Sequence, residues 1–183
     1  MVRRAVWLGV LAAVVLLGFA GVSVTQTVEA CVARGRAVLA AADPLDRAPP
    51  ALVAAVIDAH VPRGQLPDRL SVVLLDRLSC GGDAGTDWLA ERPVLAWRLA
   101  RAFDARETLG LFVSTLDTAA GPGTLGLNAG ARRFYERPIG DLSEQDVDCL
   151  VRKALGRARV HRSGPFTSGL TCGREGADFP RVY

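Results

Sequence analysis

The sequence predicts an all-α protein with one extracytoplasmic domain behind a single N-terminal transmembrane helix. Apolar residues recur at helical spacing in one segment after another, and no run of strand length alternates with a period of two. Hydrophobic residues make up 50 % of the 183 residues, which excludes a disordered chain and allows one domain with its own core. A long apolar run at the N-terminus supplies the predicted anchor.

The N-terminal segment carries the clearest physical signal. Arg3 and Arg4 precede an apolar run over residues 5–24 that is broken only by glycines and Ser23. A helix of about 20 apolar residues matches a hydrocarbon core of about 30 Å. The two arginines favour a cytoplasmic N-terminus, so residues 1–4 are expected inside and the domain outside the cell membrane. A cleaved signal peptide is the competing interpretation.

Composition narrows the classes of partner and cofactor. The net charge is +3 and aromatic residues make up 6 % of the chain, which argues against nucleic acid and against a broad sugar-stacking surface. A mild basic excess instead suits a membrane surface or a lipid phosphate. The cysteines show no C-x-x-C spacing and have no histidine at ligand spacing, which argues against a zinc site. We expect no metal and no cofactor in the domain.

The four cysteines of an exported protein favour a disulfide. We predict a bond between Cys80, which lies at a helix end beside glycines, and Cys172 in the C-terminal tail. Cys80–Cys149 is the alternative pair, and Cys31, close to the membrane, is expected to be unpaired. Buried free thiols are the remaining interpretation.

The rest of the pattern predicts helices in a fixed order. A first helix continues from the membrane over residues 25–42, and a Pro-rich linker follows at residues 43–50. Pro50 is expected to open the next helix and Asp68 to cap the one after it. Two further helices are predicted, the second apolar on nearly every side and expected at the centre of the domain: residues 93–103 and 107–116.

The last predicted helix has the best-defined start. Ser143 is expected to cap it by accepting a hydrogen bond from the backbone N–H of Asp146. Leu142, just before the cap, is expected to pack on Val147 as a hydrophobic staple. Gly156 is expected to end the helix.

These elements divide the chain into five parts. The helical domain is expected over residues 49–156, preceded by a juxtamembrane helix and linker at residues 25–48. A cytoplasmic N-terminus (1–4) and the anchor (5–24) come first. The C-terminal residues 157–183 lack periodicity and are rich in glycine, serine and proline, so we expect an irregular tail there.

Residues 123–146 are the most informative stretch of the chain and read GTLGLNAGARRFYERPIGDLSEQD. This stretch resembles a segment of the peptidoglycan glycosyltransferases, the family 51 transglycosylases that polymerise lipid II. That family typically writes the segment as G-A-Y-G-I-E-A-A-A-R-R-Y-F-G-K-P-A-S-E-L-T-L-A-E. The shared positions fall in step without a gap: Gly123, Gly126, Arg132, Arg133, Phe134, Tyr135, Pro138, Leu142 and Ser143.

Two upstream segments resemble the same family. PPALVAAVIDAHV is similar to P-x-L-V-x-A-x-I-A-A-E-D-x-x-F, and ARETLGLFVST is similar to the family's helix K-E-E-I-L-E-x-Y-L-N. The resemblance extends over residues 49–155. It implies a mostly helical, lysozyme-like transglycosylase domain.

The catalytic glutamates of the family are absent from the aligned positions of this sequence. The family, as the resemblance implies, uses one glutamate as a base toward the 4-hydroxyl of lipid II, and a second glutamate with basic residues and a divalent metal at the pyrophosphate. The first glutamate aligns here with His60 and the second with Arg92. The candidates for a replacement base are Asp58, His60 and Glu107. A histidine at a helix end more commonly interacts with the last carbonyl groups.

Four arginines are candidates for a patch that binds lipid phosphate: Arg98, Arg101, Arg132 and Arg133. A solvated helix face is the plainer interpretation. The sequence thus predicts a membrane-anchored pseudoenzyme that binds lipid II, glycan strands or a cell-wall synthesis protein. The alternatives are a divergent active glycosyltransferase and an unrelated helical, membrane-anchored interaction protein.

Overall fold

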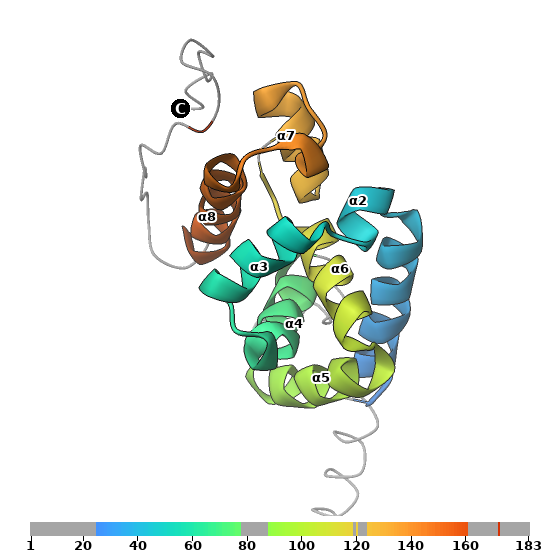
Figure 1. Ribbon diagram of the computed structural model, residues 1–183. Helices are drawn as coiled ribbons and strands as arrows, with labels where there is room; N and C mark the ends of the chain where they lie inside the picture. The colour runs from blue at the N-terminus through green and yellow to red at the C-terminus, as the bar shows by residue number, and fades with distance from the viewer. Residues whose placement is uncertain (1–24, 78–87, 119, 121–123, 161–171, 173–183) are drawn as a thin grey trace, which may run out of the picture.

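The computed structural model describes residues 25–77, 88–118, 120, 124–160 and 172 (Figure 1). These residues form helices and no strand, which confirms the predicted all-α class. In this part of the chain no helix is both long and apolar enough to cross a bilayer. The predicted anchor, residues 5–24, lies outside the described residues.

A central helix organises the domain. Residues 108–115 of this helix, α6, are all buried, as its apolar sequence predicts. The helices α2 (Pro44–Arg47), α4 (Leu66–Arg77) and α5 (Trp88–Ala102) pack against it (Figure 1). After a helix over residues 25–41, the elements in order are α2 (Pro44–Arg47), α3 (Ala51–His60), η1 (Arg63–Gln65), α4 (Leu66–Arg77), α5 (Trp88–Ala102), α6 (Ala105–Thr115), α7 (Leu127–Tyr135), η2 (Ile139–Asp141) and α8 (Glu144–Val160).

The first helix belongs to the domain that we expected to begin at residue 49. Its Val28, Cys31 and Val32 are buried in the same hydrophobic core as residues of α6 and α8. Gly35 permits the close approach, because a Cβ at this position would lie 3.1 Å from the side chain of Leu111 on α6. Cys31, which we expected to be unpaired, is disulfide-bonded.

Several predicted element boundaries are wrong. The predicted linker contains the short helix α2, which starts on local signals: the Asp43 side chain accepts from the N–H of Leu45, and Pro44 is the first helical residue. Asp68 lies inside α4 rather than at its cap, since both of its oxygens accept from Arg92 of α5, at 3.1 and 2.5 Å. Pro93 lies inside α5, which begins at Trp88. The predicted helix end at Gly156 is wrong, because α8 continues to Val160. A Cβ at Gly156 would have no neighbour within 4 Å, so the packing there does not require a glycine.

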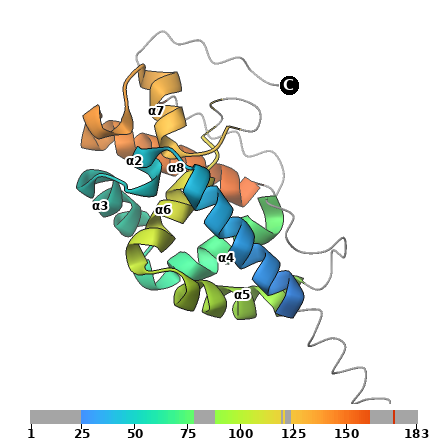
Figure 2. The ribbon, with the colours of Figure 1, turned by 90° about the vertical axis from the view of Figure 1, so that its right-hand side faces the viewer.

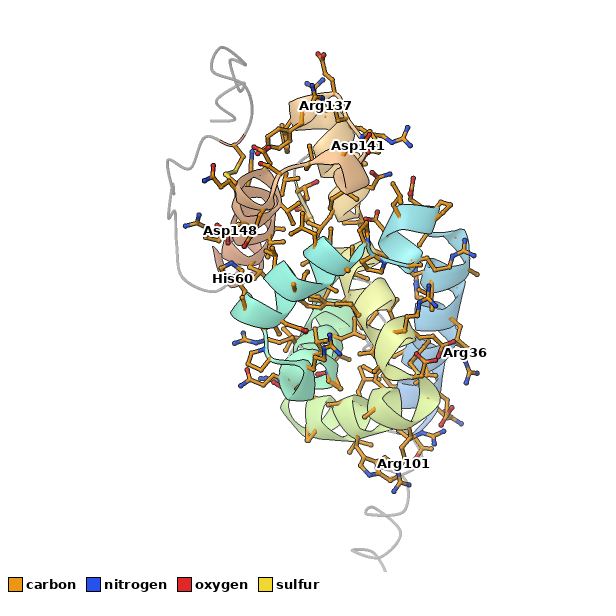
Figure 3. All side chains as sticks on the ribbon, viewed as in Figure 1. Arg36, His60, Arg101, Arg137, Asp141 and Asp148 are labelled. Atoms are coloured by element: carbon orange, nitrogen blue, oxygen red, sulfur yellow. A yellow bond between two sulfur atoms is a disulfide. The ribbon has the colours of Figure 1, made fainter. Side chains whose placement is uncertain are left out.

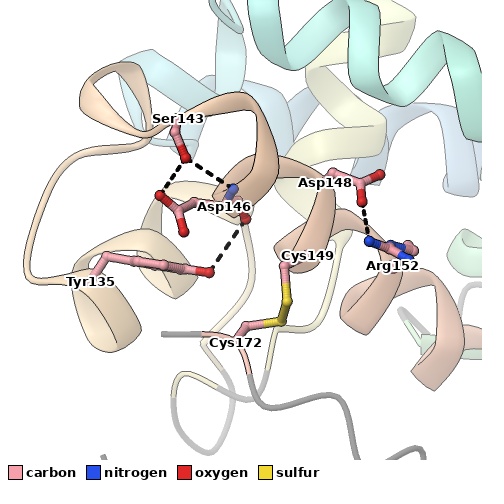
Figure 4. The surroundings of a disulfide bond; sticks show 7 residues. All are labelled: Tyr135, Ser143, Asp146, Asp148, Cys149, Arg152 and Cys172. Carbon is pink, nitrogen blue, oxygen red and sulfur yellow. Dashed lines mark hydrogen bonds and ion pairs between the residues drawn. A yellow bond between two sulfur atoms is a disulfide. The ribbon is translucent and has the colours of Figure 1, made fainter. Parts of the chain in front are cut away.

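A disulfide between Cys149 and Cys172 ties the chain beyond α8 back onto this helix (Figure 4). Both predicted pairs, Cys80–Cys172 and Cys80–Cys149, are therefore wrong, because each uses a sulfur that is bonded elsewhere. Cys80 lies outside the described residues. Helical periodicity does not show which distant segment faces Cys149, and this is why the pairing was missed.

The start of α8 confirms the predicted cap. The backbone N–H of Asp146 donates to Ser143 Oγ at 3.3 Å, and the Ser143 hydroxyl donates to the Asp146 carboxylate at 2.6 Å (Figure 4). Leu142 and Val147 are both buried in the core, as a hydrophobic staple requires.

A buried carboxylate from α2 fixes the start of α7. Asp46 is only 2 % exposed, and its Oδ1 accepts from the backbone N–H of Asn128 at 2.8 Å. The first N–H groups of a helix lack partners within the helix and carry a partial positive charge, so a carboxylate stabilises them. The Asn128 side chain in turn accepts from the N–H of Ile139 at 2.9 Å, which links α7 to η2.

Gly126 is required at this junction for two reasons. Its φ of 103° belongs to a region that residues with a side chain rarely adopt, and a Cβ would overlap the Asp46 carboxylate. We predict that Gly126→Ala lowers the free energy of unfolding by about 1–3 kcal/mol in urea denaturation. Gly64→Ala is the matched control, because a Cβ there meets nothing. Equal losses for the two variants would contradict this account.

Burial raises the pKa of Asp46 from 3.8 to about 6, because the apolar surroundings disfavour its charged form. Between these two values the folded protein keeps a proton on Asp46 that the unfolded chain has released. The contribution of Asp46 to stability is therefore complete below pH 3.8 and is lost as the pH rises through about 6.

We predict that Asp46→Asn removes this pH-dependent part of the stability. The wild-type unfolding free energy, relative to that of the variant, should fall by up to about 3 kcal/mol across the window, at about 1.4 kcal/mol per pKa unit. Urea denaturation at several pH values measures the difference. Asp141→Asn, which alters an exposed carboxylate, is the control. Parallel pH profiles for wild type and Asp46→Asn would show that Asp46 does not titrate in this range.

Candidate functional site

An apolar pocket opens between α3, α4, α6 and α8. Its volume is about 80 Å³, and apolar side chains form most of its wall. The two polar side chains in the lining, His60 and Arg69, are both basic, and the lining contains no carboxylate. The lining residues are His60, Val61, Arg69, Val72, Val73, Phe112, Leu116 and Leu155.

The central helix and the end of α3 shape this pocket. Phe112 and Leu116, both 1 % exposed, come from the C-terminal end of α6 and from the residue that follows it. The helix α3 stops at His60 because the next residue, Val61, is extended and precedes Pro62, which disfavours helical geometry before it. Val61 is thereby turned into the core, where it is buried.

His60 is joined to α8 by a carboxylate. Its Nε2 lies 2.6 Å from Asp148 Oδ1, and the other Asp148 oxygen binds Arg152 (Figures 3 and 4). The hydrogen bond from His60, assisted by Arg152, lowers the pKa of Asp148. An ionised carboxylate only accepts hydrogen bonds, so the proton is on Nε2 and Nδ1 remains available. We expected His60 to interact with the last carbonyls of its own helix, and the structure assigns it this interhelical pair instead.

The other two candidate bases also have structural partners. Asp58 accepts from Arg63 Nε at 2.7 Å. Glu107 forms a capping box with Asp104 at the start of α6: its N–H donates to Asp104 at 2.8 Å, and its carboxylate accepts from the Asp104 N–H at 2.9 Å. Glu107 therefore lies at the opposite end of α6 from Phe112, which lines the pocket.

The four predicted phosphate-binding arginines do not form one patch. Arg98 pairs with Glu29, and Arg101 stacks over Trp97 at 4.1 Å from the ring centroid. These two arginines belong to α5, whereas Arg132 and Arg133 belong to α7. Figures 1 and 2 show α5 and α7 at opposite ends of the helical body.

Two polar residues of this region were not predicted from the sequence. Arg69 lines the pocket, and Asp148 holds His60 although 88 positions separate the two. The four-residue spacing of Asp148 and Arg152 was a local signal for the ion pair within α8. Nothing local indicated the pairing of Asp148 with His60.

Within the described part of the chain, no three His, Cys, Asp or Glu side chains gather where they could hold a metal ion. The divalent metal that the resemblance implies thus lacks a ligand set among these residues. No family model, curated protein or solved structure matches the chain. The fold and pocket define a small helical domain with an apolar, basic site.

Proposed function

We propose that this protein is a membrane-anchored, extracytoplasmic domain related to the peptidoglycan glycosyltransferases, which binds a lipid-linked cell-wall precursor without polymerising it. The observation that carries the proposal is the pocket at the end of α3, whose polar lining is basic and contains no carboxylate. The resemblance of residues 123–146 supplies the class of ligand.

The pocket suits part of a ligand that has both an apolar and an anionic group. Its volume of about 80 Å³ is far below the roughly 300–1,000 Å³ of pockets that enclose a drug-sized molecule. It therefore accepts a short apolar segment while the rest of the ligand lies outside. Arg69 is exposed and forms no ion pair with the described residues, so its guanidinium is available to a phosphate group.

The carboxylates support binding rather than catalysis. A general base must reach the hydroxyl proton within hydrogen-bond distance. Asp58 Oδ2 accepts from Arg63, Glu107 is bonded at the start of α6, and neither carboxylate lines the pocket. The position that aligns with the second family glutamate is Arg92, which is paired with Asp68.

Export and anchoring rest on two further observations. The Cys149–Cys172 disulfide and the bonded Cys31 suit an oxidising compartment. The apolar run over residues 5–24, after two arginines, has the length and flanking charge of a membrane span whose C-terminal side is outside.

One observation favours the divergent enzyme as a second candidate. Asp148 orients His60 at the pocket through Nε2, and a carboxylate that orients a histidine is the arrangement of many general bases. In such an enzyme, the free Nδ1 of His60 would take the proton from the lipid II hydroxyl.

A test of catalysis distinguishes these two functions. The full chain, incubated with lipid II and a divalent metal, should form no glycan polymer, because loss of a general base typically costs about 10²- to 10⁴-fold. His60→Ala should leave this result unchanged. Electrophoresis of labelled glycan measures it. Polymer formation that His60→Ala abolishes would establish the divergent enzyme instead.

A further prediction concerns binding. Lipid II should bind the full chain in detergent micelles, and Arg69→Ala should weaken binding roughly tenfold or more through loss of a charged hydrogen bond. Val72→Trp should weaken it as well, because the indole would fill the pocket that Val72 lines. Titration monitored by fluorescence of a labelled precursor measures both effects.

Arg133→Ala is the matched control for binding, because it removes an exposed arginine from α7. Binding should be unchanged in this variant. If all variants bound as wild type, the pocket would not be the site. If wild type did not bind at all, the result would favour the alternative of an unrelated helical interaction protein.

A further inference from the structure

The outer face of α5 combines exposed apolar side chains with arginine. Val94 and Trp97 are the large hydrophobic residues that the described chain exposes, at 40 % and 51 %. Their spacing of three, with Arg101 a further turn along, places them on one stripe of the helix. The Arg101 guanidinium lies over the Trp97 ring, 4.1 Å from its centroid. Arg98 borders the same stripe and pairs with Glu29.

This α5 face, defined by Val94, Trp97, Arg98 and Arg101, lies where the described chain begins. In Figures 1 and 2 the start of the first helix and α5 occupy the same end of the body, and Figure 3 shows Arg101 at that end. The Arg98–Glu29 pair joins α5 to the first turns of this helix.

The predicted membrane span directly precedes the first described helix in the sequence. Residues 5–24 are apolar, and Glu29 follows five residues after Val24. Glu29 lies on the helix that begins at Thr25, the residue after this run, and five residues of helix measure about 8 Å. The polar headgroup layer on each side of a bilayer is about 5–8 Å thick. A span over residues 5–24 would therefore place the α5 face at the level of the lipid headgroups.

We propose that the α5 face docks on the outer surface of the anionic bilayer in which residues 5–24 are anchored. Tryptophan is enriched at the membrane–water interface, where the ring contacts the upper acyl chains and the polar edge stays wet. Arginine places its aliphatic stem on the apolar layer and its charge against lipid phosphate. Arg98 neutralises Glu29, the acid beside the stripe, so Arg101 leaves a positive charge for the lipid.

This docking extends the proposed function, and it rests on the membrane anchor proposed there. It would fix the domain against the membrane by two attachments, the span and α5, and so set the orientation of the pocket toward a lipid-linked ligand. The following test separates docking on lipid from an α5 face that stays in water and is open to a partner protein.

Tryptophan quenching in vesicles tests the proposal on the full chain. Trp7→Phe and Trp88→Phe leave Trp97 as the single tryptophan. The chain is reconstituted in vesicles of phosphatidylcholine and phosphatidylglycerol, with or without brominated acyl chains. We expect Trp97 emission to be shifted to shorter wavelength and quenched by the brominated lipid. Arg101→Glu should lose most of this quenching.

Arg137→Glu, at the opposite end of the body in Figure 3, is the control and should keep the quenching of wild type. Trp97 emission at the wavelength of a water-exposed indole, unquenched in vesicles that retain the chain, would overturn the proposal. So would an Arg101→Glu variant that is quenched as fully as wild type. Precursor binding in micelles is measured without a bilayer surface, so its failure is distinguishable from failure of docking.

Discussion

The carboxylate of Asp46, on α2, binds the backbone at the start of α7 and so joins the central helix to the C-terminal helices. It belongs to α2, which packs on the central helix α6, and it accepts from the backbone of α7. Asn128 extends this contact to η2, and Ser143 then starts α8. Since α8 supplies one wall of the pocket, the shape of the site depends on this buried contact. The missing Cβ of Gly126 leaves room for the carboxylate, and its positive φ favours glycine as well, which explains the glycine within the most informative stretch of the sequence.

Acidic side chains serve the structure throughout this domain. Asp104 and Glu107 cap α6, Asp68 joins α4 to α5 through Arg92, and Asp148 joins α8 to α3 through His60. Each carboxylate satisfies donors or a positive charge that would otherwise be unpaired. The pocket is left with apolar walls and with the exposed Arg69. The interhelical pair of His60 and Asp148 accounts for a polar side chain at the end of an apolar helix.

Local signals predicted the helices well, and long-range partners could not be predicted from them. The Ser143 cap, the buried α6 and the start of α3 each depend on residues within about one turn of the element. The partner of His60 lies 88 positions away, and the partner of Cys172 is chosen by how α8 faces the tail. The four arginines were candidates for a single patch, yet α5 and α7, which carry them, lie at opposite ends of the body (Figure 1). The periodicity of one helix carries no information about which distant helix packs on it.

The central claim is that the pocket between α3, α4, α6 and α8 receives the ligand. Methyl NMR of the full chain in micelles, with labelled valine, tests it most directly during titration with lipid II. We expect the methyl signals of Val61, Val72 and Val73, which line the pocket, to shift together, and that of Val147 at the start of α8 to stay in place. Shifts confined to other valines, or no shift at saturating precursor, would contradict it.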